Sequence, residues 1–277
     1  MADPVQTYYD AFDEWARLES PGGKLEWNRT LSYVSSRLPE AADVLDVGGG
    51  PGRYTIALAE AGHQVSLIDP SAMQIESARS RAAEAGVQDR ISSIGTGDIR
   101  DLSRFPAETF DAGLALGPFY HLIDTDDRSV AARELFRVLR PGAEAFVSVI
   151  PRLSGLAGLI QRSAQDPEQV PASALRHAKE TGVFINPTDR GFQNGYYPEI
   201  AEIQELFASA GFEQLDFLSV RSFAFGAETQ LQTISEWSPS AAASFGELIE
   251  SSCRNRAVIA LCGHAILVLR RPSTDAA

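Results

Sequence analysis

Glycines beside a carboxylate are the first feature of the sequence that could do chemistry. Asp46 lies within a short apolar run, residues 44–47, and Gly48, Gly50 and Gly52 follow it at alternate positions. Glycine lets a backbone adopt positive φ and approach a ligand closely. The residues after Gly52 suit a helix, whose first amides would point at the bound molecule. The pattern predicts a strand, a tight turn and a helix around a ligand site.

The glycine spacing excludes two nucleotide-binding loops. The dinucleotide fingerprint Gly-x-Gly-x-x-Gly needs a third glycine where Arg53 or Thr55 stands. The phosphate loop needs a lysine, and none follows Gly52. The remaining pattern, Asp-x-Gly-x-Gly-x-Gly, closely resembles motif I of the class I S-adenosylmethionine (SAM)-dependent methyltransferases. The resemblance implies SAM as cofactor, S-adenosylhomocysteine (SAH) as product, and a loop that wraps the amino-acid end of the cofactor.

Two further acidic residues follow the next two predicted strands. Asp69 ends the apolar run 65–68, and a carboxylate there can accept two hydrogen bonds from a ribose diol. It could instead cap the following helix. Asp98 can bond an adenine amino group while Ile99 packs on the ring, although a solvated turn is the alternative. The resemblance assigns Asp69 to the ribose, and Asp98 and Ile99 to the adenine.

The loop after the fourth predicted strand, with the sequence GPFYHL, holds the candidate catalytic residues. Ligands of open α/β sheets lie beyond the carboxyl ends of the strands, so Leu116 is expected to contact the cofactor. Phe119 and Tyr120 are expected to wall the pocket, Tyr120 beside the reacting groups. His121 could take a proton from a hydroxyl or an amine, or could be a structural histidine that bonds a backbone carbonyl. The string resembles a group of bacterial methyltransferases that act on small molecules.

Further aromatic residues and a second histidine complete the candidate site. Phe192, Tyr196 and Tyr197 lie in a segment with scattered glycine and proline and could line the roof of a substrate pocket. His264 opens the last predicted strand, where it could contact substrate or transfer a proton, or simply lie at a capped strand end. In methyltransferases that resemble this chain an aromatic N-terminal helix closes over the cofactor, and Tyr8 or Tyr9 could do so here.

The composition argues against several classes of partner. The 277 residues are 44% hydrophobic, and 24 basic against 37 acidic residues give a formal net charge of −13. Because nucleic-acid binding relies on lysine and arginine at phosphates, we expect no nucleic-acid partner. No apolar run reaches ~18 residues and the N-terminus lacks a leader pattern, so we expect no membrane association and a cytoplasmic protein. Cys253 and Cys262 have no metal-binding spacing, and we expect no metal.

Short buried runs alternate with helical patterns, which is typical of an α/β fold. The expected strands are residues 44–47, 65–68, 91–94, 110–116, 145–150, 212–225 and 264–269. The resemblance implies a Rossmann-like, mostly parallel sheet in the order 3-2-1-4-5-7-6, with the last strand antiparallel and helices on both faces.

The chain is expected to divide into a core and an insertion. Residues 1–150 and 199–277 would form the SAM-binding core with its N-terminal helices. Residues 151–198 change in composition and are expected to form an inserted helical cap, and residues 230–262 are a possible second lid element.

The resemblance and the motifs predict a methyltransferase that acts on an oxygen or nitrogen of a small-molecule acceptor. Two alternatives remain open. The chain could bind SAM or SAH without catalysis as a regulatory protein, or it could methylate protein or RNA. The sequence indicates no oligomeric state.

Overall fold

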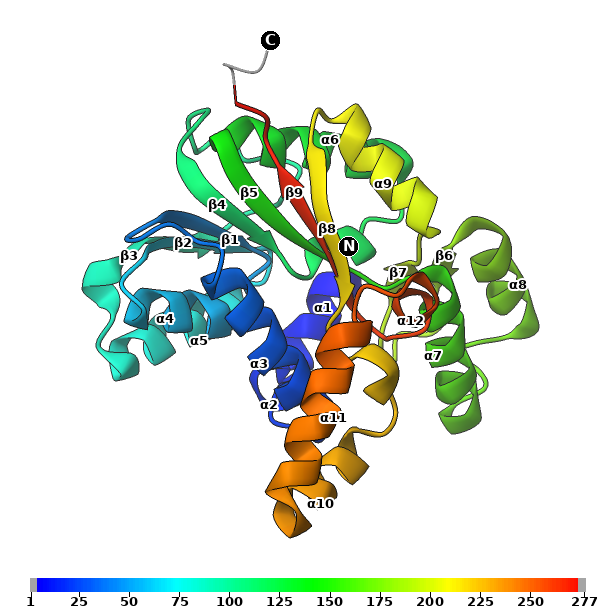
Figure 1. Cartoon of the computed structure of the whole chain (residues 1–277). Helices are drawn as coiled ribbons and strands as arrows, with labels where there is room; N and C mark the ends of the chain where they lie inside the picture. Colours follow the sequence, from blue (N-terminus) through cyan, green and yellow to red (C-terminus); the bar gives the residue numbers. More distant parts are fainter. Residues whose placement is uncertain (1–3, 274–277) are drawn as a thin grey trace.

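One seven-stranded sheet organises the chain (Figure 1). The computed structural model describes residues 4–273, except for the side chains of Pro4, Tyr9 and Ala11. The strand order is β3-β2-β1-β4-β5-β9-β8. Strand β9 runs antiparallel to β5 and β8, and the other neighbouring pairs are parallel. This confirms the predicted order and the antiparallel last strand. The strands are β1 (Asp43–Val47), β2 (Gln64–Asp69), β3 (Ile91–Thr96), β4 (Phe110–Ala115), β5 (Leu139–Val149), β8 (Glu213–Ser219) and β9 (Ala265–Arg270).

Two hydrophobic layers cover the two faces of the sheet. Alternate residues of a strand point to opposite faces, and in β9 Leu267 joins one layer while Ile266 joins the other. One layer packs the sheet against α6 and α9, and the other packs it against α3 and α4. The predicted arrangement of helices on both faces is therefore confirmed.

The helices follow the chain in the order of their numbers. The α-helices are α1 (Pro4–Ala11), α2 (Glu14–Arg17), α3 (Pro21–Ser35), α4 (Arg53–Glu60), α5 (Ala72–Ala85), α6 (Thr125–Val138), α7 (Arg152–Gln165), α8 (Ala172–Thr181), α9 (Ile200–Ser209), α10 (Glu228–Trp237), α11 (Pro239–Ser252) and α12 (Arg256–Ala260). Three short 3-10 helices are η1 (Gln88–Arg90), η2 (Pro118–Tyr120) and η3 (Ser222–Ala224).

Two predicted strand boundaries are wrong. The strand expected over residues 212–225 ends at Ser219, and Ser222 has φ of 54°, which an extended strand does not accommodate. Strand β5 begins at Leu139, where it pairs with Phe110, so residues 139–144 belong to the strand that was expected to begin at residue 145.

The segment between β5 and α9 has a small hydrophobic cluster of its own. Helices α7 and α8 pack against a two-stranded hairpin of β6 (Val183–Ile185) and β7 (Asn194–Tyr196). The cluster includes Leu159, Phe184 and Tyr197. The sequence predicted the two helices and missed the hairpin, because a strand of three residues shows no periodicity.

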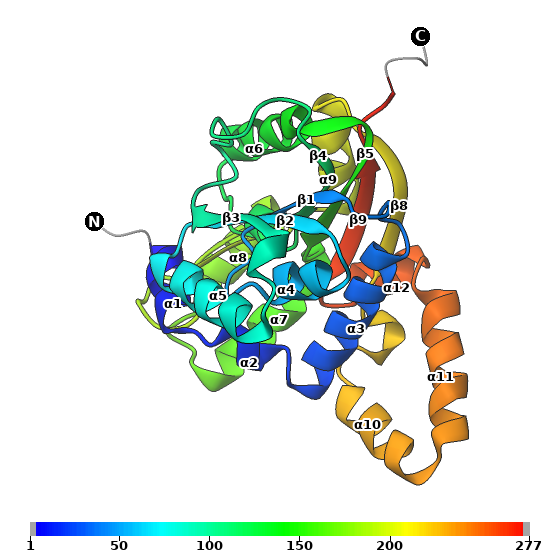
Figure 2. The same cartoon turned by 90° about the vertical axis from the view of Figure 1, so that its left-hand side faces the viewer.

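The N-terminal helices lie beside the carboxyl ends of the parallel strands. Helix α1 lies next to α5, and α3 packs beside α10 (Figure 2). Helices α10 and α11 form a hairpin that projects away from the sheet (Figure 2). Within residues 4–273, no helix is long and apolar enough to cross a membrane.

Candidate active site

A cavity of about 300 Å³ opens at the carboxyl ends of the parallel strands. The strand ends contribute Val47, Asp69, Leu116 and Ser148, and Ile266 enters from β9. This is the edge where open α/β sheets bind their ligands. The volume lies at the lower end of the range for small-molecule sites.

The glycine loop bounds the cavity where β1 meets α4. Gly48 has φ of +67°, and a Cβ on it would lie 2.7 Å from Cγ of Pro118. Gly50 also has positive φ and lines the cavity. Gly52 does not line it; it caps α4 at φ 82° and packs against Ala78. Glycine is therefore required at Gly48 for both conformation and space.

Asp46 packs against the glycine loop. Its side chain is buried and accepts a hydrogen bond from Oγ1 of Thr55 at 2.7 Å. Burial raises the pKa of Asp46 to about 6, against the hydrogen bond from Thr55. A Cβ on Gly49 would lie 2.6 Å from its Oδ2, so the carboxylate fixes the approach of the loop.

Asp69 joins the end of β2 to the glycine loop. Its Oδ2 accepts a hydrogen bond from the amide of Gly50 at 2.9 Å, and its Oδ1 accepts one from the amide of Ser71 at 2.8 Å. Ser71, and not Asp69, caps α5. Burial raises the pKa of Asp69 to about 6. Each carboxylate oxygen has a second lone pair, so both can accept a further hydrogen bond from a diol.

Asp98 and Ile99 lie in the cavity wall after β3, and Leu116 lies in it after β4. Asp98 pairs with Arg100, which also bonds Asp127. Partial burial opposes ionisation, but Arg100 lowers the pKa of Asp98 below its ordinary value. The Ile99 side chain is buried. An acceptor beside an apolar surface can hold an adenine edge and face.

All three candidate catalytic residues line the cavity and lie in a row. The ring centroids of His264 and Tyr120 are 5.7 Å apart, and those of Tyr120 and His121 are 4.7 Å apart. Nδ1 of His121 lies 3.1 Å from the carbonyl oxygen of Asn194. Because a carbonyl oxygen only accepts, Nδ1 carries the proton, and in the neutral ring Nε2 carries the lone pair. The backbone bond expected of a structural histidine is thus present.

Three of the four predicted substrate residues are buried away from the cavity, and those predictions are wrong. Phe119 is 1% exposed and packs edge-on against Phe207, because η2 turns it into the core. Tyr196 lies under the guanidinium of Arg128, 3.6 Å from its ring centroid. Tyr197 is buried in the cluster of α7 and α8.

Neither of the two remaining aromatic predictions places a described side chain in the cavity wall. Phe192 does not line the cavity; its ring lies 5.2 Å from that of His121 and 6.3 Å from that of Tyr8. Phe192 therefore contacts both α1 and His121. Tyr9 lies in α1, and its side chain is outside the described part of the structure.

The sequence missed the charged residues that the N-terminal helices bring to the cavity. Glu14, Arg17 and Glu26 all line it. Glu26 is buried and lies 3.1 Å from Nδ1 of His264. Its position on the buried face of α3, three residues after Gly23 and four before Thr30, was a usable signal. A carboxylate on the buried face of an amphipathic helix needs a partner.

The donor set does not suit a metal. Among residues 4–273, no group of three or more His, Cys, Asp and Glu side chains could hold a metal ion. The cavity instead presents acceptors, backbone amides and apolar surface, which are the groups that bind a nucleoside.

Residues 44–142 match a family model described as a methyltransferase domain. The matched region holds the glycine loop of the cavity, and the seven-stranded fold around it is the fold of solved SAM-dependent methyltransferases.

Relatives of known name place this domain among enzymes with different acceptors. The ubiquinone biosynthesis O-methyltransferase of Xanthomonas axonopodis is 32% identical over 162 residues, 57% of this chain and 63% of that protein. The tRNA 5-carboxymethoxyuridine methyltransferase of Escherichia coli K12 is 37% identical over 118 residues, 42% of this chain and 43% of that protein. The match thus spans less than two thirds of either relative.

The fold is also that of a solved small-molecule methyltransferase. The 1,6-didemethyltoxoflavin-N1-methyltransferase of Burkholderia thailandensis, solved with that compound and SAH bound, is 17% identical with a TM-score of 0.55. The alignment covers 99% of this chain and 92% of that one. At this identity the likeness concerns the fold alone.

Proposed function

We propose that the protein transfers a methyl group from SAM to an oxygen or nitrogen of a small-molecule acceptor. The observation that carries the proposal is that one cavity is lined both by the glycine loop with Asp69 and Asp98 and by Tyr120, His121 and His264. We assign the first group to a cofactor end and the second group to an acceptor end.

The residues at the first end fit SAM. Asp69 would accept hydrogen bonds from the ribose hydroxyls, and Asp98 with Ile99 would hold the adenine. The amides of the glycine loop would meet the amino-acid end, where a Cβ on Gly48 would collide with Pro118. SAM would supply a methyl group on a positively charged sulfur that is already activated for displacement.

The residues at the second end orient the acceptor and take its proton. Transfer needs the acceptor atom in line with the methyl group, and such positioning supplies much of the acceleration. Tyr120 would form a wall of the acceptor site, and a histidine Nε2 would accept the proton of a hydroxyl. A neutral amine can react before it loses its proton, so the base matters most for an oxygen acceptor.

The segment of residues 151–198 would act as a cap on the acceptor end. It reaches the cavity through Asn194, whose carbonyl oxygen bonds His121. Residues 230–262, all of them described, contribute nothing to the cavity wall, so a second lid there has no support from the cavity.

A tRNA acceptor is the second candidate because one relative is named for it. The net charge of −13 disfavours it, since each phosphate contact needs a cation. A third possibility is a protein that binds SAM or SAH without transfer.

A mass-spectrometric acceptor panel tests the proposal. The protein is incubated with SAM and, in separate reactions, with catechols, phenols, primary amines and bulk tRNA. We expect the mass of one methyl group to be added to a small molecule, and SAH to form in equal amount. Methylation of tRNA alone would favour the second candidate, and SAH binding without transfer to any acceptor would favour the third.

A further inference from the structure

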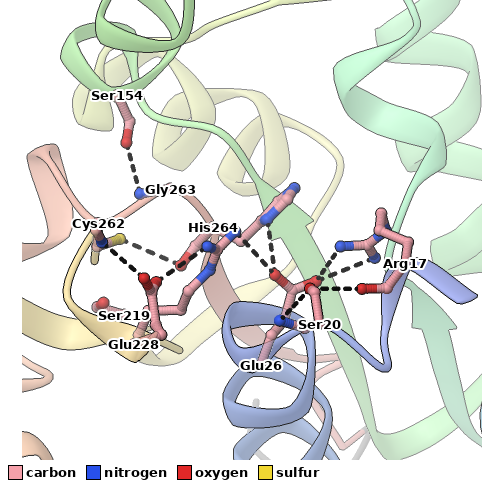
Figure 3. A network of polar contacts seen from close by, with 12 residues as sticks. Arg17, Ser20, Glu26, Ser154, Ser219, Glu228, Cys262, Gly263 and His264 are labelled. Carbon is pink, nitrogen blue, oxygen red and sulfur yellow. Dashed lines mark hydrogen bonds and ion pairs between the residues drawn. The ribbon is translucent and has the colours of Figure 1, made fainter. Parts of the chain in front are cut away.

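A cluster of charged side chains, shown in Figure 3, surrounds His264 and forms part of the cavity wall. At its centre, the Glu26 carboxylate lies between His264 and Arg17. Arg221 approaches the same carboxylate at 3.4 Å and also pairs with Glu228 at 3.1 Å. Four separate chain segments, from α2 to the start of β9, meet here.

We propose that Glu26 is a positioning residue that holds His264 as the proton acceptor for a hydroxyl substrate. The inference rests on the proposed function and names which histidine serves it and how. Glu26 acts through His264 and is not itself a catalytic residue.

The contact with Glu26 determines the tautomer of His264. Oε2 of Glu26 lies 3.1 Å from Nδ1 of the histidine. An ionised carboxylate only accepts hydrogen bonds, so Nδ1 carries the proton, and in the neutral ring Nε2 carries the lone pair. His264 lines the cavity, which makes Nε2 the ring nitrogen for an acceptor molecule.

The neighbours of Glu26 keep it ionised. Burial alone would raise its pKa, but the hydrogen bond from His264 and the positive charges of Arg17 and Arg221 hold the pKa well below its ordinary range. The carboxylate therefore keeps its charge at neutral pH. A charged partner stabilises an imidazolium more than a carbonyl does, and Nδ1 of His121 bonds the carbonyl oxygen of Asn194.

The charge of the whole cluster also suits proton uptake. The ionisable groups around His264 are Glu14, Glu26, Glu228, Arg17, Arg221, Tyr54, Tyr120 and Cys262. With the three carboxylates ionised and the tyrosines and the thiol neutral, three negative and two positive charges leave one negative charge. A proton on His264 brings the cluster to neutrality, which lowers the cost of forming a buried cation.

The step balances without another reactant. As the acceptor oxygen bonds the methyl carbon, its O–H proton passes to Nε2 of His264, and the electron pair of the broken carbon–sulfur bond stays on sulfur. The imidazolium then returns its proton to solvent as the cavity opens.

Nitrogen NMR of the histidine rings tests the geometry directly. The chain has 4 histidines, and a His264→Gln variant assigns the signal. In the wild-type protein with SAH bound, we expect His264 to carry its proton on Nδ1 and none on Nε2. A proton on Nε2 would overturn the proposal, and this result needs neither an acceptor nor a folded Glu26 variant.

Matched variants test the consequence. Glu26→Gln keeps the shape and removes the charge, and Glu228→Gln makes the same change in the same cluster without touching His264. With the acceptor found in the panel, we expect kcat to fall at least about tenfold in Glu26→Gln, with a pH profile that differs from that of the wild type. Glu228→Gln also removes one negative charge from the cluster but leaves the contact between Glu26 and His264, so kcat should fall less there than in Glu26→Gln.

The two proposals fail in different ways. SAH affinity measured by calorimetry should stay unchanged in both variants, which shows that the cofactor end is intact. A kcat and a pH profile of Glu26→Gln equal to those of the wild type would overturn the role of Glu26 while leaving methyl transfer established. A wild-type protein that binds SAH and methylates nothing would overturn the proposed function and, with it, the role of Glu26.

Discussion

At the scale of single residues, Asp69 is the side chain on which cofactor binding most depends. Asp69→Asn removes the charge that would accept the ribose hydroxyls and sets an NH₂ group against a backbone amide of Gly50 or Ser71. A hydrogen bond to a charged group contributes about 1.5–3 kcal/mol, so SAH affinity should fall about 10- to 100-fold. Isothermal titration calorimetry measures the change.

Asp89→Asn is the matched control, because Asp89 is exposed and lies outside the cavity wall. It should bind SAH as tightly as the wild type. Equal affinity of a folded Asp69→Asn variant would remove Asp69 from the ribose site.

The pH dependence of SAH binding follows from the same residue. Burial raises the pKa of Asp69 to about 6 in the free protein, and the ionised form is the one that accepts hydrogen bonds from a diol. SAH binding must then release a proton at low pH. Affinity should be constant above about pH 7 and fall about tenfold per unit below pH 6.

Asp46, whose pKa burial also raises to about 6, can add to this slope. Asp69→Asn should therefore reduce the slope below pH 6 without necessarily removing it. An affinity that is flat between pH 5 and 8 in the wild type would contradict the assignment.

The residues that could be predicted from the sequence are those tied to a strand end. Asp69, Asp98 and Leu116 follow strands whose carboxyl ends share one edge of the sheet, so knowing the strands locates the residues. Glu26 and Arg17 come from helices before the first strand. They reach the cavity only through tertiary packing, which local patterns do not encode.

At the scale of elements, the strands that lie between other strands were readable because both faces of each are buried. Runs such as residues 65–68 are apolar except for Ser66, and the order of the strands follows from the resemblance. The β6–β7 hairpin and the turn of η2 were not readable. The strands of the hairpin have three residues each, which is too short to show a period. In η2, the backbone turn decides whether a side chain faces the core or the cavity.

A variant of Phe119 tests whether the side chain at this position in η2 faces the core. Phe119 is 1% exposed and packs against Phe207, so Phe119→Ala should lower the free energy of unfolding by about 3–5 kcal/mol. Denaturant unfolding measures the loss. Phe223→Ala, at a side chain 50% exposed, should change stability by less than about 0.5 kcal/mol. A stable Phe119→Ala protein that has lost only acceptor binding would restore Phe119 to the substrate site.

At the scale of the whole molecule, both ends of the chain close one cavity. Glu14 and Glu26 come from the N-terminal helices, His264 immediately precedes the last strand, and Ile266 lies in it. In the proposed function, the core of the domain binds the cofactor and these distant segments form the acceptor end.

Transfer from SAM with a carbon-13 methyl group tests the central claim most directly. The protein is incubated with labelled SAM and, separately, with low-molecular-weight cell extract, bulk tRNA and a protein fraction. The account predicts label in a small molecule of the extract, and far less of it with Asp69→Asn at limiting SAM. Label only in the tRNA or protein fraction, or SAM binding with no transfer of label to any fraction, would contradict it.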